Sequence, residues 1–161
     1  MEKINQKIKP FLWYDGRAEE AMKLYTSVFK NSKILNINRH DNLSAGPVSS
    51  VVVGTFQIEG QKFMAMDAGP MFKFSQAISF YVDCDTQEEV DELWEKLSEG
   101  GEKQGCGWLI DKFGVAWQII PAILEKYMQD KDPKKVARVM EAMLKMSKIN
   151  IKGLKEAYEK E

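Results

Sequence analysis

The side chains in this sequence that are best suited to contact a small molecule are aromatic residues that carry a polar group. Tyr14, Tyr81 and Trp108 each combine an apolar ring with one hydrogen-bonding group. Ligand pockets are mostly apolar and hold a few polar groups that fix the orientation of the ligand. We therefore predict that these three residues contact a ligand. Trp13 and Trp117 are interpreted as core residues, because large aromatic side chains supply much of the burial energy of a core.

Asp67 is a weak candidate for a catalytic residue and a candidate ligand contact. A carboxyl group in an apolar environment has a raised pKa, which would let Asp67 act as a general base. The alternative is a turn residue, because Asp67 comes directly before Ala68-Gly69-Pro70 and aspartate is common in turns. The sequence leaves both roles open, and it assigns no other catalytic residue.

Histidine and cysteine do not form a predicted nucleophile–base pair. The chain has one histidine, His40, and two cysteines, Cys84 and Cys106. Nucleophilic catalysis needs the base within hydrogen-bond distance of the nucleophile. His40 falls in the first half of the sequence, whereas both cysteines fall in the second. We interpret the cysteines as structural residues, since free cysteine commonly behaves as a small buried hydrophobe.

Composition excludes several classes of partner and compartment. The 161 residues have a formal net charge of -1, whereas a nucleic-acid-binding surface normally brings a basic excess. No apolar run approaches the roughly 18 residues that span a bilayer. Residues 1–7 lack the apolar segment of a secretory signal. We expect a cytoplasmic protein with reduced thiols, no nucleic-acid partner and no membrane partner.

Hydrophobic periodicity predicts the same order of elements twice. In the first half, residues 9–67, an apolar segment over 9–14 ends at the turn Asp15-Gly16. A helix follows, whose apolar stripe is Ala18, Ala21, Met22, Tyr25, Val28 and Phe29. Three strands are predicted over residues 33–39, 48–58 and 61–67, with a loop over 41–47. This half therefore reads strand, helix and three strands.

The second half, residues 76–121, repeats that order. A strand over residues 77–82 leads to Thr86 and Glu89, which have the spacing of a capping box at a helix start. Gly100-Gly101 ends the helix, because glycine readily takes the left-handed conformation. Short strands are predicted around residues 102–104, 108–111 and 116–120.

Residues 122–161 form a predicted helical tail. A short helix extends to Met128, and Asp132-Pro133 places a cap residue before a first-turn proline. The next helix has an apolar stripe of Val136, Val139, Met140, Met143 and Leu144, and a last helix covers residues 151–158. The tail can bury this stripe on its own domain or on a second subunit. We predict a homodimer, because an exposed apolar patch usually marks an interface.

Several motifs resemble a known family. They are Pro10-Phe11-Leu12-Trp13-Tyr14-Asp15-Gly16, Ala18-Glu19-Glu20-Ala21, Tyr25, Ile78-Ser79-Phe80, Glu88-Glu89-Val90-Asp91, Cys106-Gly107-Trp108, Asp111, Phe113-Gly114, Trp117-Gln118 and Pro121. Together they resemble the 3-demethylubiquinone-9 3-methyltransferase domain, a glyoxalase-like branch of the vicinal-oxygen-chelate (glyoxalase, bleomycin-resistance and dioxygenase) superfamily. The resemblance covers nearly the whole chain, including the tail from Lys148 to Ala157. It implies an α+β fold of paired βαβββ modules in one domain, residues 1–161, whose curved mixed sheets form a cup.

The resemblance also places the ligands that related enzymes use for a metal. These positions fall on Pro10, on Gln118, on Ala77 or Gln76, and near Ala65 or Asp67. Transition metals prefer several imidazole, thiolate or carboxylate donors, and this set offers at most one carboxylate. We predict no metal and no cofactor. If Pro10 and Gln118 face the cup, Leu12 and Tyr14 face it too, and Trp13 and Trp117 lie under the helices.

Three functions stay open at this point. The first is a glyoxalase-like protein that binds or converts a small molecule in a metal-free cup rich in apolar and aromatic residues. Its predicted ligand contacts are Tyr14, Asp67, Gln76, Tyr81, Trp108 and Gln118. The second is a metal-dependent lyase, isomerase or dioxygenase with an atypical site around Asp67 and Gln118. The third is a protein–protein interaction module that uses the helical tail.

Overall fold

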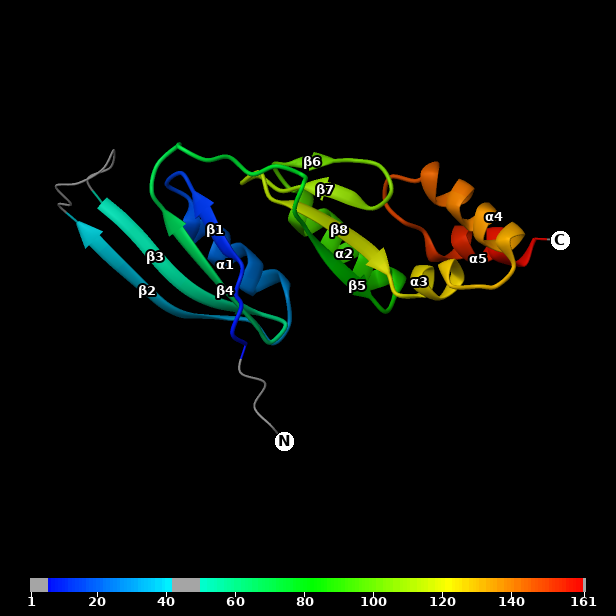
Figure 1. Ribbon diagram of the computed structural model, residues 1–161, viewed down its shortest axis with the longest axis horizontal. Helices are drawn as coiled ribbons and strands as arrows, with labels where there is room; N and C mark the ends of the chain where they lie inside the picture. The colour runs from blue at the N-terminus through cyan, green and yellow to red at the C-terminus, as the bar shows by residue number, and fades with distance from the viewer. Residues whose placement is uncertain (1–5, 42–49, 161) are drawn as a thin grey trace, which may run out of the picture. The chain divides into compact units, whose positions relative to one another are not determined.

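Two four-stranded sheets organise the chain, one in each of two compact units, Met1–Phe74 and Ser75–Glu161 (Figure 1). The computed structural model describes residues 6–41 and 50–160. Most of the loop predicted over residues 41–47 lies outside the described residues. The first unit holds the first predicted half, and the second holds the second half with the tail. That both units work as a single domain stays a prediction.

The first unit contains strand, helix and three strands in chain order. They are β1 (Phe11–Tyr14), α1 (Ala18–Val28), β2 (Lys33–Asp41), β3 (Ser50–Ile58) and β4 (Gln61–Asp67). The strand order across the sheet is β1-β4-β3-β2. β1 runs parallel to β4, and the other neighbours are antiparallel. The sheet is therefore mixed.

Helix α1 covers one side of this sheet (Figure 1). Its buried residues are Ala18, Ala21, Met22 and Tyr25, all from the predicted stripe. Gly54 of β3 lies beneath the helix, where an added Cβ would stand 2.6 Å from the sulfur of Met22. The fully buried ring of Phe56 stacks on Phe63 at 5.4 Å between ring centroids. This layer is the core of the first unit.

The second unit repeats the arrangement. Its elements are β5 (Ser79–Cys84), α2 (Gln87–Ser98), β6 (Glu102–Lys103), β7 (Trp108–Ile110) and β8 (Ala116–Pro121). The strand order is β5-β8-β7-β6, with β5 parallel to β8 and the other pairs antiparallel. The order of elements and the pairing pattern match those of the first unit, which confirms the predicted βαβββ repeat.

The residues predicted to begin and end α2 have nearly the predicted roles. The Thr86 hydroxyl oxygen accepts a hydrogen bond from the Glu89 backbone N–H at 3.2 Å. The Glu89 carboxylate accepts from the N–H of Asp85 at 2.8 Å, one residue earlier than in the usual capping box. At the other end, Gly100 has a φ of 71°, the left-handed conformation expected after a helix.

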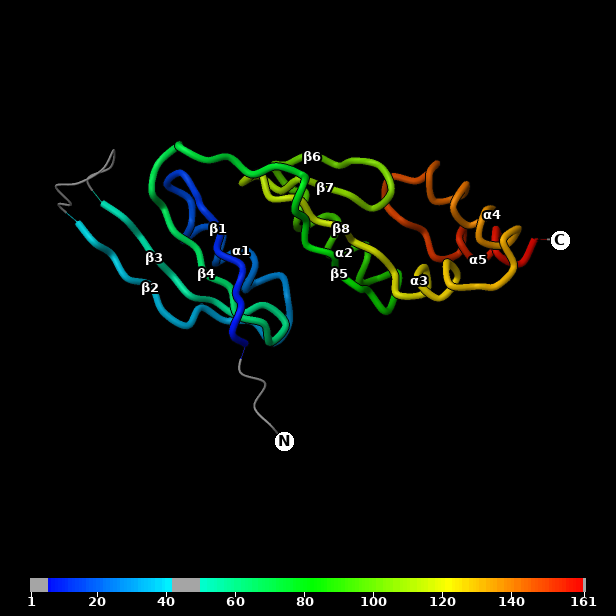
Figure 2. Tube along the Cα trace, in the orientation of Figure 1, coloured from blue at the N-terminus to red at the C-terminus, as the bar shows by residue number. Residues whose placement is uncertain are grey.

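Three helices form the tail: α3 (Ile123–Met128), α4 (Pro133–Leu144) and α5 (Ile151–Glu159). Helices α4 and α5 lie side by side (Figure 2). They close a hydrophobic cluster of five buried residues within the second unit. Its members are Ile120, Leu124, Val139, Ile149 and Leu154. Part of the predicted stripe is thus covered by the chain itself.

These observations confirm the α+β class, with two βαβββ modules and a C-terminal helical tail. The expectation that the two sheets together form a cup concerns the placement of one unit against the other and stays a prediction. No described helix is both long and apolar enough to cross a membrane.

Candidate functional site

Each sheet has one side packed against its helix and one side turned away from it, which we call its open face. On β1 the helix side holds Leu12 and Tyr14. Tyr14 is only 3% exposed, its hydroxyl donates to the hydroxyl of Tyr25 on α1 at 3.3 Å, and its ring meets Phe74 edge-on at 5.1 Å. The prediction that Tyr14 faces a ligand cup is therefore wrong, because the phenol is part of the contact with α1.

Trp13 has the opposite orientation to the one predicted. It lies on the open face of the first sheet, where its indole N–H donates to the Gly69 carbonyl at 2.8 Å. Its ring meets Phe72 edge-on at 4.9 Å. Side chains alternate along a strand, so Pro10 shares the side of Tyr14 and not that of Trp13. The prediction assumed that Pro10 faces the cup. This assumption placed Tyr14 toward the cup and Trp13 under the helix, which is the reverse of what the structure shows.

Asp67 also lies on the helix side of the first sheet, in register with Tyr14. Its Oδ1 accepts a hydrogen bond from the backbone N–H of Ala18 at 2.8 Å. The first N–H groups of a helix have no partner within the helix, and the cap residue Arg17 supplies no side-chain hydrogen bond. Asp67 therefore supplies the hydrogen-bond acceptor for the first backbone N–H group of α1. This structural role corrects the interpretation of Asp67 as a general base or ligand contact.

The open face of the second sheet holds a row of predicted site residues. Tyr81 of β5 is in register with Gln118 of β8, and Gln118 is in register with Trp108 of β7. Residues in register on neighbouring strands project on the same side of a sheet. The opposite side carries Trp117, which is 2% exposed beside α2, as predicted for a core residue. Tyr81, Gln118 and Trp108 thus lie side by side away from the helix.

Three hydrogen bonds tie further residues to this row. The Gln118 amide nitrogen donates to the Ser79 hydroxyl at 2.9 Å. The Gln76 amide nitrogen donates to the side-chain oxygen of Gln104 at 2.6 Å, and the Gln104 backbone N–H donates to the Trp108 carbonyl. Four of the six predicted contacts, Gln76, Tyr81, Trp108 and Gln118, therefore converge on one sheet. Tyr14 and Asp67 do not belong to it.

Sequence reasoning missed Ser79 and Gln104. A signal for Ser79 existed, because the alternation of β5 puts it on the same side as Tyr81. Gln104 carried no such signal. It follows a strand of two residues, and its place beside Trp108 depends on the pairing of β6 with β7.

The row Tyr81–Gln118–Trp108 carries no charged side chain. Partial burial raises the pKa of the Tyr81 phenol above its usual value of 10, and the negative charges of Asp83 and Glu125 add to this shift. Tyr81 is therefore protonated and uncharged at neutral pH. The row consists of an amide, a phenol and an indole, which can orient a ligand through hydrogen bonds and apolar contact.

The two cysteines are free thiols. Cys84 is fully buried on the helix side of β5. Burial, with a smaller effect of Glu89, Asp83 and Asp85, raises the pKa of the Cys84 thiol to about 12. A thiol with so high a pKa is a poor nucleophile, because the thiolate is the reactive form. This supports the structural role predicted for Cys84.

The donors on this face do not suit the metals that related enzymes use. Within residues 6–41 and 50–160, no three His, Cys, Asp or Glu side chains lie close enough to hold a metal ion. Gln118, its partner Ser79 and the neighbouring Tyr81 offer amide and hydroxyl oxygens. Zinc and other first-row transition metals prefer imidazole, thiolate or carboxylate ligands.

Two βαβββ modules of this kind define a glyoxalase-like fold of the vicinal-oxygen-chelate superfamily. Residues 6–120 match the family described as 3-demethylubiquinone-9 3-methyltransferase, and the chain belongs to this family. The PhnB protein from Bacillus cereus is 42% identical, and the match covers 73% of this chain and all of that one, with a TM-score of 0.66.

More distant structures share the fold. Protein PA1353 from Pseudomonas aeruginosa is 23% identical over 71% of this chain and 96% of its own, with a TM-score of 0.55. The fosfomycin resistance protein FosX from Listeria monocytogenes, in complex with Mn(II) and sulfate, is 17% identical over 71% and 89% of the two chains, with a TM-score of 0.53. No curated protein matches the chain significantly. The family match ends at residue 120, so the predicted resemblance over the tail is not part of it.

Proposed function

We propose that the chain binds an uncharged small molecule on the open face of the second sheet, without a metal. The observation that carries this proposal is the row of Tyr81, Gln118 and Trp108 across three neighbouring strands. The two aromatic residues offer apolar surface on either side of the amide. A polar group between apolar surfaces is typical of small-molecule sites.

The hydrogen bond to Ser79 determines what Gln118 can offer a ligand. Its amide nitrogen donates to Ser79, and no described group donates to its side-chain oxygen. That oxygen can therefore accept a hydrogen bond from an N–H or O–H group of a ligand. No lysine or arginine is part of the row to balance an anion, and Asp83 and Glu125 lie near enough to Tyr81 to affect its pKa. A ring that carries a hydrogen-bond donor and no negative charge fits best.

The two alternative functions receive less support. A metal-dependent enzyme with a site around Asp67 and Gln118 would need the Asp67 carboxylate, which is occupied by the start of α1. A protein–protein module on the tail keeps only part of its predicted surface, because Val139 of the α4 stripe is fully buried within its own unit. Binding, with orientation of the ligand by Gln118, remains the proposal.

Benzamide and benzoate provide a matched pair of probes. They have the same size and shape, but only benzamide is uncharged and carries N–H donors. With fluorotryptophan in the protein, fluorine NMR follows Trp108 separately from Trp13, Trp94 and Trp117. We expect benzamide to shift the Trp108 signal with a Kd that is roughly millimolar, as for a fragment of this size. Benzoate should leave it unchanged.

The variant Gln118→Leu separates ligand binding from stability. Loss of the hydrogen bond to the ligand should weaken benzamide binding by about 0.5–1.5 kcal/mol, and the melting temperature without probe should fall only slightly, because the hydrogen bond to Ser79 is lost as well. Gln129→Leu, an exposed glutamine at the end of α3, is the matched control. A lower melting temperature with unaltered affinity would show that Gln118 is structural. Absence of any benzamide effect on Trp108 in the wild-type protein would overturn the proposal.

We also propose that the chain is a homodimer in the cytoplasm. The dimer is supported by an apolar groove of about 560 Å³ on α4, which the tail itself leaves open; Val136, Met140 and Leu144 are among its lining residues. The location is supported by the two free thiols.

A further inference from the structure

The tail that lies beyond the family match contacts the loop that leads into Trp108. This loop, residues 104–107, joins β6 to β7, and the tail segment 146–150 joins α4 to α5. The Cys106 N–H donates to the Met146 carbonyl, and the Gly107 N–H donates to the Ser147 carbonyl, both at 2.8 Å. The Ser147 hydroxyl donates to the Gln104 carbonyl at 2.6 Å. Figure 2 shows the two segments side by side.

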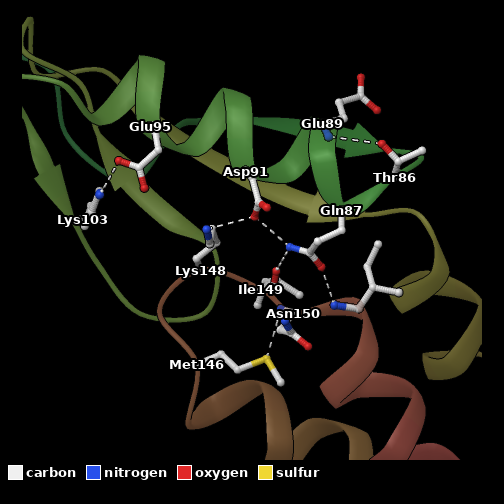
Figure 3. Close-up of polar contacts among 11 residues, drawn as sticks. Thr86, Gln87, Glu89, Asp91, Glu95, Lys103, Met146, Lys148, Ile149 and Asn150 are labelled. Atoms are coloured by element: carbon white, nitrogen blue, oxygen red, sulfur yellow. Dashed lines mark hydrogen bonds and ion pairs between the residues drawn. The ribbon is translucent and has the colours of Figure 1, made fainter.

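Helix α2 holds the tail segment in place from the other direction. The Gln87 amide nitrogen donates to the Ile149 carbonyl at 3.1 Å, and its oxygen accepts from the Ile151 N–H at 2.7 Å. The ammonium of Lys148 lies 2.9 Å from the Asp91 carboxylate. Figure 3 shows Gln87 and Asp91 of α2 with Lys148 and Ile149 of the tail. The segment is thus fixed to a helix that is itself part of the module core.

The side chain of Ile149 fills the space between the loop and β8. It is fully buried, and it packs in a cluster with Ile120, two residues after Gln118 on the same strand and the same side. An added Cβ at Gly107 would stand 3.0 Å from Ile149 and 2.8 Å from Ile120. The tail therefore closes one end of the open face, next to the residues of the proposed ligand site.

The loop needs this external support. Cys106 has a φ of 58°, which is strained for a residue with a side chain, and Gly107 has a φ of 78°. The neighbouring strands β6 and β7 contain only two and three residues. Besides the pairing of β7 with β8, the loop makes three hydrogen bonds with the tail: two to the carbonyls of Met146 and Ser147, and one from the Ser147 hydroxyl to the Gln104 carbonyl.

We propose that the C-terminal tail positions Gln104 and Trp108 for ligand binding, with Ser147 as the positioning residue. The consequence for ligand binding rests on the proposed function, whereas the positioning of Trp108 is measurable without any ligand. The tail then determines how well the open face of this family member fits its ligand, although it lies outside the part of the chain that the family shares.

The test uses the full-length chain labelled with fluorotryptophan. Ser147→Ala should shift or broaden the Trp108 signal and leave Trp94, on α2, unchanged. It should also weaken benzamide binding, roughly two- to tenfold for one lost hydrogen bond. Ser147→Thr keeps the hydroxyl and should restore both measurements. Lys145→Ala, which removes an exposed ion pair with Glu141 in the same tail, is the matched control and should change neither.

Several outcomes would overturn the inference. One is an unchanged Trp108 signal in Ser147→Ala. Another is a shift of Trp94 and Trp108 together with a lower melting temperature, which would indicate a general structural role. A third is a failure of Ser147→Thr to restore the signal. If Trp108 responds as expected but the wild-type protein does not bind benzamide, the positioning by the tail holds and the proposed function fails.

Discussion

The carboxylate of Asp111 organises the turn that leads into β8. It is 2% exposed, and it accepts hydrogen bonds from the backbone N–H groups of Phe113 and Val115 and from the indole of Trp117. A buried carboxylate is stable when several donors compensate for its loss of water. Asp111 thus ties the turn to Trp117, the residue that precedes Gln118 on β8.

Replacing Asp111 by asparagine should destabilise the second unit. The amide keeps one acceptor oxygen but directs an N–H group toward donors that need an acceptor, which should lower the free energy of unfolding by about 2–3 kcal/mol. Denaturant unfolding followed by tryptophan fluorescence measures this change. Asp83→Asn, an exposed position on β5, is the control and should leave stability nearly unchanged. Equal effects of both substitutions would contradict the role assigned to Asp111.

The sequence predicted the second half of the candidate site and not the first. Tyr81, Trp108 and Gln118 were identified from their residue types and from the family resemblance, and strand alternation places them on one side. In the first half the alternation of β1 was clear, but it does not say which side meets the helix. The contact of Tyr14 with Tyr25 decides that, and it depends on how α1 packs. The cap that Asp67 provides to α1 also joins residues distant in sequence.

At the scale of elements, the loop between β6 and β7 is tightly constrained. Gly107 combines a left-handed backbone with a close approach of its neighbours: an added Cβ would stand 2.8 Å from Ile120 and 2.9 Å from the Ile119 carbonyl. Gly100 has a similar φ of 71°, but the nearest atoms to its added Cβ belong to the flexible side chain of Lys112 at 3.4 Å. Both glycines have a left-handed backbone, but only Gly107 is crowded by its neighbours. Comparing alanine variants of the two therefore distinguishes the cost of backbone strain from the cost of crowding.

We expect Gly100→Ala to cost about 1 kcal/mol of stability, the typical cost of a left-handed alanine. Gly107→Ala should cost about 3 kcal/mol, because crowding against β8 adds to the same strain. Denaturant unfolding of both variants measures the difference. Hydrogen exchange should also show faster opening of the tail segment 146–150 in Gly107→Ala alone. Similar losses of stability in the two variants would mean that the residues around position 107 move to accommodate the added methyl group at no cost in free energy.

Most elements were predictable because they depend on local pattern. The apolar stripes of α1 and α2, the Thr86 cap and the Asp132-Pro133 start of α4 all lie within short stretches of sequence. Boundaries were less certain: the strand predicted over residues 77–82 is observed as Ser79–Cys84. The docking of the tail was not predictable, because Gln87 and Ile149 lie far apart in the chain and carry no shared signal.

At the scale of the whole molecule, α4 has two kinds of apolar residue. Val139 is fully buried among the tail helices, whereas Met140 is 39% exposed and Leu144 is 64% exposed. Of the two predicted ways to bury the stripe, Val139 follows the first, because α4 packs within its own unit. The apolar surface of Met140 and Leu144 is the part that a second copy would bury.

We expect light scattering to detect a dimer at roughly tens of micromolar protein, a range in which stable dimers persist. Leu144→Glu should give a monomer, because a charge without a partner opposes burial of the apolar patch. Lys152→Glu on the exposed side of α5 is the control and should stay dimeric. A wild-type monomer at this concentration, or a dimer that survives Leu144→Glu, would rule out this interface.

The parallel pairings in both sheets have a consequence for how the chain folds. Phe11 pairs with Met64 and Ser79 pairs with Ala116, whereas β3 and β4 are joined by the tight turn at Glu59-Gly60. Pairing distant segments requires closing a long loop, whose entropy is lost before the contacts form. We therefore expect the hairpins to form early and β5 and the tail to join afterwards. On this view the surface around Gln118 is complete only when these segments have docked, and we expect it to be the first to be lost when they open.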